Sequence, residues 1–362
     1  MKIGIITWHY YKNFGSALQA FALQSTLSKW GDVEFINYHK PIYGIPNKKK
    51  DTVRFLLGMT LGRMPFSFAS RFMAGRLMFE RNHLHVGKLT IEESDLPSLT
   101  KKYDVIFCGS DQIWAPNVFS PVYFAAFAGK EIKKVSYAAS IGLNTLPEEL
   151  VYKYKELLSD FHAISVREDE GRQLLKDKCG IDAKVVLDPT LLHDAAFYKR
   201  CQRVVPNVNG DYIFCYFLNE EHKYGKSVRD YALQRKLKVI GVSFNSSDND
   251  YMENLVGMEL GADHFIWLIE NAKVVLTDSY HGTIFSLLFH KEFRVFQRFE
   301  EKSPICQNSR IRQLQSYFGL KGRILRDIDP IIDNDGYDFN TFESRIQPLR
   351  EASVAFIKEA LR

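Results

Sequence analysis

Short apolar runs alternate with amphipathic stretches along most of the chain, an order that predicts a parallel α/β fold. Each run is rich in β-branched or aromatic residues, as buried strands of parallel sheets are. The expected strands are residues 2–7, 33–38, 103–110, 134–140, 162–168, 184–190, 211–218, 238–244, 273–279 and 293–296. Apolar residues at helical spacing follow the first strand, at Leu18, Phe21, Ala22 and Leu27. Such alternation builds right-handed βαβ units.

The strands fall into two series, and we expect one domain from each. Residues 193–210 separate the series and end in a Pro/Asn/Gly stretch typical of a linker. A chain of 362 residues is also long for a single core. The prediction is two Rossmann-like domains facing across a cleft, at 1–195 and 210–330, with a C-terminal helical segment at 331–362. Open α/β sheets bind ligands beyond the carboxyl ends of their strands.

Composition and charge narrow the class of protein. The chain is 46% hydrophobic and 25% charged, which is typical of globular domains. Its first residues predict a strand and no apolar run approaches the roughly 20 residues of a membrane span, so we expect a cytoplasmic protein. No Cys, His or carboxylate spacing indicates a metal site. A phosphate loop and a G-x-G-x-x-G fingerprint are both absent, which weakens kinase and dinucleotide-binding alternatives.

Two of the predicted strand ends carry groups suited to anions or sugar oxygens. Asn13, Phe14 and Gly15 open the first helix, whose free N–H groups point toward the cleft. Arg167 lies at the tip of the strand at 162–168, where its guanidinium could hold a phosphate or a carboxylate in two hydrogen bonds. The alternatives are an ordinary capped turn at the first place and, at the second, an ion pair of Arg167 with Glu168 or Asp169.

A third strand end, after residues 103–110, has groups suited to a sugar. Ser110, Asp111 and Gln112 offer hydrogen-bonding groups for hydroxyls, and Trp114 offers an apolar face. The alternative is a helix cap formed by Ser110 or Asp111, with Trp114 packed in the core.

The fourth strand end is a strand–turn–helix junction that contains Ser279, Tyr280, His281 and Gly282. A histidine at a helix N-terminus is well placed for anion binding and proton transfer. The alternative is a structural or capping role for His281.

The segment at 40–90 carries ten Lys and Arg residues against only Asp51 and Glu80. Arginines interleaved with Phe, Leu and Met are typical of a segment that lies on an anionic membrane surface. The alternative is a helical subdomain whose apolar side chains pack on the core while the arginines face water. We do not expect nucleic-acid binding, because no recognition motif accompanies the charge.

In this order, the segments resemble the polysaccharide pyruvyl transferase family over roughly residues 1–300. They are GIITWHYYKNFGSALQAFALQ, YDVIFCGSDQIWAPN, VSYAASIG, ISVREDEG, VLDPTLL and VVLTDSYHGTIFSLLF. The resemblance implies a GT-B-like fold with the acceptor side in the first domain and the donor side in the second. It also implies phosphoenolpyruvate as co-substrate without a further cofactor, and a glycan hydroxyl as acceptor. The expected product is a pyruvate ketal in the synthesis of a capsule or exopolysaccharide.

The resemblance also assigns roles to matching residues. His281 corresponds to the family's essential histidine and is the candidate for the acid or for assisting the departure of phosphate, with Asp111 as a candidate base for the attacking hydroxyl. Arg167 corresponds to an arginine that contacts the donor, together with the groups around His281. Many members have Arg where this chain has Tyr280, so another cation is expected to replace it. The candidates are Arg294, Arg298 and Arg310.

Two other functions fit the same residues. A nucleotide-sugar-dependent glycosyltransferase would share the fold, and a non-catalytic glycan-binding protein would keep the cleft without needing His281. If the acceptor is carried on a polyprenyl lipid, the segment at 40–90 would bring the protein to the inner face of the membrane.

Overall fold

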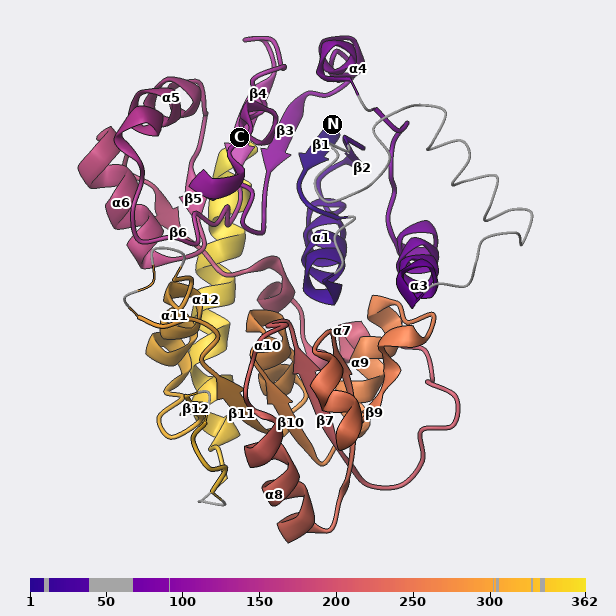
Figure 1. Cartoon of the computed structure of the whole chain (residues 1–362). Coiled ribbons are helices and arrows are strands. Elements are labelled where there is room, and N and C mark those ends of the chain that lie inside the picture. Colours follow the sequence, from indigo (N-terminus) through magenta and orange to yellow (C-terminus); the bar gives the residue numbers. More distant parts are fainter. Residues whose placement is uncertain are drawn as a thin grey trace.

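The computed structural model describes residues 1–9, 13–38, 68–90, 92–301, 303, 306–326, 328–332 and 336–362. These residues form two parallel α/β halves, one above the other in Figure 1, with the carboxyl ends of their strands facing a shared cleft. This is the architecture that the alternating pattern predicts.

The N-terminal half is built around a parallel sheet in the order β2-β1-β3-β4. Its elements are β1 (Lys2–Ile6), α1 (Phe14–Leu27), β2 (Asp32–Phe35), α3 (Phe68–His83), α4 (Leu96–Thr100), β3 (Val105–Cys108), β4 (Lys133–Ser136), α5 (Glu148–Ser159), β5 (Ser165–Val166), α6 (Asp169–Cys179) and β6 (Lys184–Val185). In register, Ile3 pairs with Val33 on one side and Val105 on the other. The short β5-β6 pair continues the sheet through two isolated bridges from the β4 region.

The C-terminal half has a parallel sheet in the order β12-β11-β10-β7-β8-β9. Its elements are β7 (Tyr212–Phe217), α8 (Gly225–Arg235), β8 (Lys238–Ser243), β9 (Glu253–Asn254), α9 (Ala262–Asn271), β10 (Val274–Thr277), α10 (Tyr280–Leu288), β11 (Glu292–Phe296), α11 (Ser309–Phe318) and β12 (Ile324–Leu325). Every residue of β7 and β10 is buried, because helices cover both faces of the sheet.

Helix α1 lies where the two halves meet. Its N-cap is Asn13, whose side-chain oxygen accepts a hydrogen bond from the Gly15 N–H at 2.8 Å. Phe14 packs on Tyr216 and Phe265 of the other half, with ring centroids 5.6 and 5.1 Å apart. The first helix therefore belongs to a core that the two halves share.

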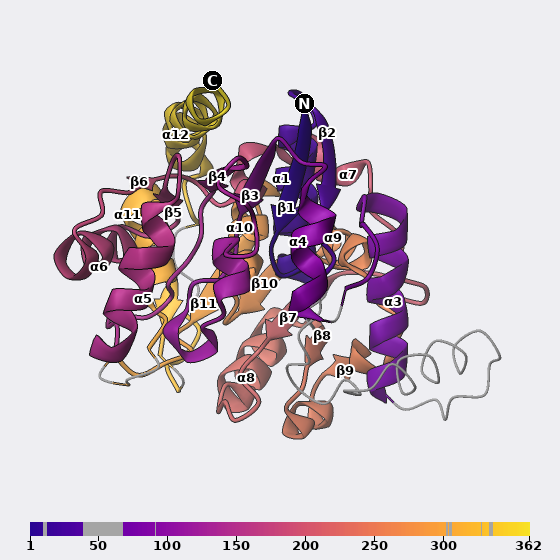
Figure 2. The ribbon, with the colours of Figure 1, turned by 90° about the horizontal axis from the view of Figure 1, so that it is seen from above.

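Helix α12 (Phe339–Ala360) connects the halves a second time. It runs from beside α11 to the N-terminal sheet, so that both chain ends lie at the same edge in Figure 2. Ile357 and Ala360 join the core formed by Ile3 and Val105, and the Ser353 hydroxyl accepts a hydrogen bond from the Leu187 N–H at 3.0 Å.

Helix α3 makes a third connection between the halves. Gly75 lies so close to the C-terminal half that an added Cβ would be 2.4 Å from the Leu260 carbonyl carbon. Phe79 is buried and Arg81 is exposed, as the helical-subdomain alternative requires, but Arg76 is buried and does not face water. The rest of the proposed membrane segment, residues 39–67, lies outside the described residues.

All ten predicted strands are present, although most are shorter than the apolar runs. The runs end early because the chain turns into the cleft, as at Asp111 and Ala138, both of which have positive φ. Helices α5 and α11 were not predicted. The expected linker contains a short helix, α7 (Ala195–Lys199), which holds Tyr198 in the core.

Candidate active site

A cavity of about 420 Å³ opens in the cleft, and its wall is made by residues that follow the carboxyl ends of strands in both halves. It is lined by Trp8, Asn13, Ser16, Asp111, Gln112, Val118, Leu218, Glu220, Phe244, Asp278, Ser279, Tyr280, His281, Arg298, Phe299, Gln307 and Arg310. The predicted candidates Asn13, Asp111, Gln112 and the run Ser279–Tyr280–His281 thus meet at one place.

The N-terminal wall offers groups that bind hydroxyls. The Ser16 hydroxyl donates to Oδ2 of Asp111 at 2.6 Å, and the Gln112 N–H donates to Oδ1 at 2.9 Å. The side-chain nitrogen of Gln112 is buried and has no hydrogen-bond partner among the described residues. A buried, unpaired donor costs free energy, so a ligand oxygen at this position would be stabilising.

The C-terminal wall carries two arginines, Arg298 and Arg310, together with the carboxylates Glu220 and Asp278. Arg298 follows β11 and donates to the Leu218 carbonyl at 3.3 Å, while Arg310 on α11 donates to the side-chain oxygen of Gln307 at 2.8 Å. Both partners are neutral, and neither arginine forms an ion pair within the described residues. Burial, together with the positive charges of Arg167 and Arg298, lowers the pKa of Arg310 to about 10. Two arginines that repel each other beside a cavity suit an anion with more than one charged group.

Asp278 shapes the same wall from the end of β10. Its two carboxylate oxygens accept hydrogen bonds from the backbone N–H groups of Leu218 and Asn219, at 2.7 and 2.9 Å. Burial raises the pKa of Asp278, although Arg298 and these N–H groups act in the opposite direction. The carboxylate therefore holds the β7–α8 loop against the cavity.

His281 lies in the first turn of α10, which Ser279 caps by accepting a hydrogen bond from the Gly282 N–H at 3.2 Å. Its Nε2 lies 3.4 Å from Oδ2 of the buried Asp188. Its Nδ1 edge lies against Gly15, where an added Cβ would be only 2.0 Å from Nδ1. Gly15, predicted to bind the acceptor, therefore makes room for the imidazole.

Arg167 is buried beside the cavity rather than in its wall. Its Nε donates to Glu168 at 2.8 Å and its Nη1 donates to Asp188 at 2.7 Å. The ring of Tyr280 lies over the guanidinium, whose central carbon is 4.5 Å from the ring centroid. Burial alone would lower the pKa of Arg167, but the neighbouring carboxylates raise it well above its usual range. Both the predicted position at the strand tip and the alternative pairing with Glu168 are present.

Trp114 was predicted to offer an indole face to a sugar, and the structure corrects this. The side chain is fully buried in the N-terminal core, stacked on Phe124 with ring centroids 5.0 Å apart. Its Nε1–H donates to the Tyr123 carbonyl at 3.0 Å. Trp114 packs as the structural alternative required.

Three other candidates also lie behind the cavity wall. The Ser110 hydroxyl is buried and donates to the Ala138 carbonyl at 2.9 Å. Phe14 is a core residue between the two halves. Gly282 allows α10 to begin close to β10, since an added Cβ would lie 2.4 Å from the Thr277 hydroxyl. Each of these residues positions the site without lining it.

Several residues of the wall were missed by sequence reasoning. Trp8 lies two residues after β1 and packs edge-on against Tyr123, with centroids 6.1 Å apart. Its position just after a predicted strand could have identified it as a cavity residue, but Trp114 was chosen as the tryptophan that faces the sugar. Of the three arginines considered as replacements, Arg298 and Arg310 line the cavity, whereas Arg294 is buried beside Glu292. The other missed residues are Ser16, Val118, Leu218, Glu220, Phe244, Asp278, Phe299 and Gln307.

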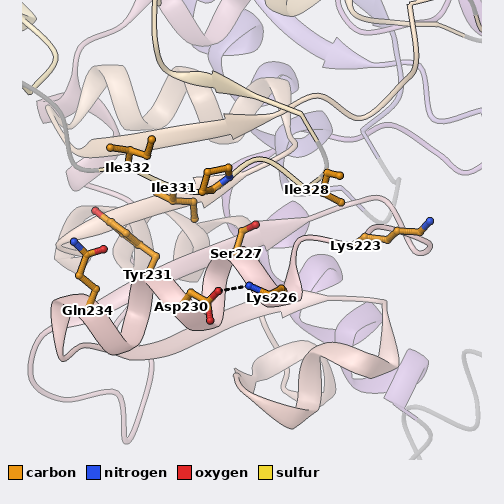
Figure 3. A pocket seen from close by; sticks show the side chains of 10 residues that line it. Lys223, Lys226, Ser227, Asp230, Tyr231, Gln234, Ile328, Ile331 and Ile332 are labelled. Atoms are coloured by element: carbon orange, nitrogen blue, oxygen red, sulfur yellow. Dashed lines mark hydrogen bonds and ion pairs between the residues drawn. The ribbon is translucent and has the colours of Figure 1, made fainter.

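A larger hollow, of about 610 Å³, lies on the C-terminal half alone, between α8 and residues 328–332 (Figure 3). Lys226 points along its floor and is paired with Asp230 at 2.7 Å. All the described residues that line this hollow belong to the C-terminal half, so the hollow is separate from the cavity between the two halves.

Two Rossmann-like halves with a polar cavity between the carboxyl ends of their strands define a GT-B-like α/β enzyme. The sequence profile described as polysaccharide pyruvyl transferase matches residues 13–298. The chain therefore belongs to the polysaccharide pyruvyl transferase family, which is a family of enzymes. No curated protein sequence matches the chain significantly.

Several solved structures are similar to the chain, and the first one described here, with a TM-score above 0.5, supports the fold. A protein from Listeria monocytogenes assigned as a UDP-N-acetylglucosamine 2-epimerase has a TM-score of 0.51 at 10% identity, over 99% of this chain and 91% of that chain. The UDP-GlcNAc 2-epimerase from Methanocaldococcus jannaschii has a TM-score of 0.48 at 12% identity, over 96% and 92%. E. coli heptosyltransferase WaaC has a TM-score of 0.40 at 14% identity, over 99% of each chain.

Two absences hold for the described part of the chain. None of its helices is both long and apolar enough to cross a membrane. No group of three or more His, Cys, Asp or Glu side chains in it is arranged to hold a metal ion.

Replacing Gly15 by Ala should lower turnover by about 100-fold, because the new methyl group displaces the His281 ring and misplacements near 1 Å cost about that much. The measurement is steady-state kinetics, with Gly336→Ala as control, since nothing lies within 4 Å of a Cβ at Gly336. An increase in acceptor KM with normal kcat would instead support the predicted acceptor contact.

Proposed function

We propose that the protein transfers a pyruvyl group from phosphoenolpyruvate to hydroxyls of a glycan, forming a ketal during cell-surface polysaccharide synthesis. One observation carries the proposal: a single cavity joins His281, the hydroxyl-binding pair Ser16–Asp111 and two arginines that form no ion pair within the described part of the chain. The family supplies the reaction class, and the charge distribution of the cavity suits the two substrates.

The donor would bind against the C-terminal wall. Phosphoenolpyruvate carries a phosphate and a carboxylate, so it needs two cationic contacts rather than a base-binding pocket. Arg298 and Arg310 supply these contacts from neighbouring segments, and the N-terminus of α10 adds free N–H groups. Binding of the anion would also relieve the repulsion that lowers the pKa of Arg310. Arg298 and Arg310 are our candidates for the cation that replaces the arginine found in many family members where this chain has Tyr280.

Arg167 would act from behind this wall. Tyr280 separates its guanidinium from the cavity, and Glu168 and Asp188 already occupy two of its donors. One terminal nitrogen, Nη2, is buried without a partner among the described residues. We assign Arg167 to the donor side through its charge and through the groups that it orients.

The acceptor would bind against the N-terminal wall, where Asn13, Gln112 and Ser16 present polar groups. Trp8 takes the place that we had expected for Trp114, because it is the tryptophan that lines the cavity. An indole beside hydroxyl-binding groups suits the apolar face of a sugar ring.

The chemistry then needs one acid and one base. His281 would protonate C3 of phosphoenolpyruvate while a sugar hydroxyl adds to C2, with Asp111 accepting the hydroxyl proton. The C2–O bond to phosphate breaks next, and phosphate leaves with the electron pair. A second hydroxyl of the same sugar adds to C2 and loses its proton, which closes the ketal. General acid catalysis of this kind contributes about 10²–10⁴-fold.

The deciding experiment measures phosphate release from phosphoenolpyruvate against a panel of free and lipid-linked glycans. We expect release that depends on a glycan and falls by about 10²-fold or more in His281→Gln. His290→Gln is the matched control, because that histidine is half-exposed and ion-paired with Glu343 at 2.8 Å.

Other outcomes identify the rival functions. Transfer from a nucleotide sugar without use of phosphoenolpyruvate would indicate a glycosyltransferase. Glycan binding that survives in His281→Gln, with no release of phosphate in either protein, would indicate a non-catalytic role.

Arg310→Gln should raise the KM for phosphoenolpyruvate about tenfold or more, since a hydrogen bond to a charged group is worth about 1.5–3 kcal/mol. Arg326→Gln is the matched control, because the Arg326 side chain is 81% exposed and pairs with Asp329. If only the acceptor KM rises, the donor lies on the other wall.

A polyprenyl-linked acceptor and contact with the inner face of the membrane belong to the same proposal. Their support is the basic composition of residues 40–90, and since α3 packs on the protein, the contact falls to residues 39–67. We expect co-sedimentation with anionic liposomes at low salt that weakens when Arg54 and Arg63 become Gln. Binding that is absent, or insensitive to both changes, would leave only the structural interpretation.

A further inference from the structure

Asp188 is a buried carboxylate that sequence reasoning did not single out, and it lies where the two halves meet. Its Oδ1 accepts hydrogen bonds from the N–H and the hydroxyl of Thr190, at 2.9 and 2.7 Å. Its Oδ2 accepts one from Arg167 at 2.7 Å and lies 3.4 Å from Nε2 of His281. Asp188 therefore belongs to the N-terminal half, where it follows β6, and its contact with His281 places it at the candidate active site.

The groups around Asp188 keep it negatively charged. Burial would raise its pKa, but His281, Arg167 and the Thr190 hydroxyl together hold that pKa well below its usual range. Tyr137 and Tyr198 also face it from β4 and α7, and burial followed by the charge of Asp188 raises the pKa of each phenol. The remaining neighbours in this network are Glu168, which pairs with Arg167, and Tyr280, which covers it.

A carboxylate beside Nε2 has two effects on a histidine. It favours a proton on Nε2 in the neutral ring, and it stabilises the doubly protonated ring. The Nδ1 edge then faces the opposite side, against Gly15 and between the cavity-lining residues Asn13 and Ser16 in sequence. The proton that leaves the imidazolium toward a substrate is the one on Nδ1.

We infer that Asp188 is a positioning residue for His281, which fixes the orientation and the tautomer of the ring for its role as acid. This inference rests on the proposed function, because it assigns the acid a partner. Outer partners of this kind are typically worth about 10–100-fold in activity.

Glu168 provides a matched comparison. Asp188 and Glu168 are both buried carboxylates that pair with Arg167, at 2.7 and 2.8 Å, but only Asp188 has an ion-pair contact with His281 among the described residues. A role that runs only through Arg167 would make the two residues equivalent. A role through His281 would separate them.

The kinetic test compares Asp188→Asn with Glu168→Gln. We expect Asp188→Asn to lower kcat by about 10–100-fold, with little change in the KM for phosphoenolpyruvate. Asp188→Asn should also weaken the preference of the neutral His281 ring for a proton on Nε2, because an amide is a weaker acceptor than a carboxylate. Glu168→Gln should leave that preference in place. Equal effects of the two variants on kcat and on the tautomer would overturn the inference.

A spectroscopic test does not depend on activity. In the ¹⁵N-histidine spectrum of the wild-type protein, assigned with His281→Gln, the neutral His281 ring should carry its proton on Nε2. A proton on Nδ1 would overturn the inference. If the ring has the expected tautomer and Asp188→Asn weakens the preference for it, but kcat is unchanged, then the positioning role stands and the proposed role of His281 as acid fails.

Discussion

The pairing of buried charges at the junction of the two halves is the constraint on which the rest of the site depends. A guanidinium or a carboxylate inside a protein costs several kcal/mol unless it is paired and hydrogen-bonded. Arg167 pairs with Glu168 and Asp188, which meets much of this requirement, and the Asp188 oxygen that pairs with Arg167 also lies 3.4 Å from Nε2 of His281 in the opposite half. The same buried charges thus constrain both the relative placement of the two halves and the position of His281.

The two walls of the cavity differ in their functional groups. The N-terminal wall has a carboxylate, an amide and a hydroxyl, which suit neutral sugar groups, whereas the C-terminal wall has two arginines that repel each other beside the carboxylates Glu220 and Asp278. In the proposed function the anionic donor lies on the side of the arginines and the glycan on the side of the hydroxyl-binding groups. Gly15 and Gly282 contribute no functional group to either wall. Their lack of a side chain leaves room for His281 beside Gly15 and for Thr277 beside Gly282.

Much of the fold could be predicted because buried parallel strands are continuous apolar runs, and these survive as a signal without knowledge of tertiary contacts. The helix that carries Arg310 was missed, since it follows a polar loop with no strand before it. The site was predictable to the level of strand ends: Asp111, Gln112 and His281 meet as expected. The sequence did not predict which side chains of these strand ends face the cavity. Asp111 has positive φ, and the chain after it turns Trp114 into the core. Burial of Arg167 under Tyr280 likewise depends on packing between halves, which local sequence does not encode.

Helix α12 has a consequence for how the chain is made. The core that holds β1 is completed by Ile357 and Ala360, which come from the opposite end of this sequence. A ribosome releases β1 long before it releases α12, so the apolar face that α12 covers must wait while the whole C-terminal half is synthesised. Domains usually fold in order as they emerge. Here the N-terminal half would emerge first and reach its final packing last, which makes this sheet the part of the molecule most exposed to misassembly and to chaperones during synthesis.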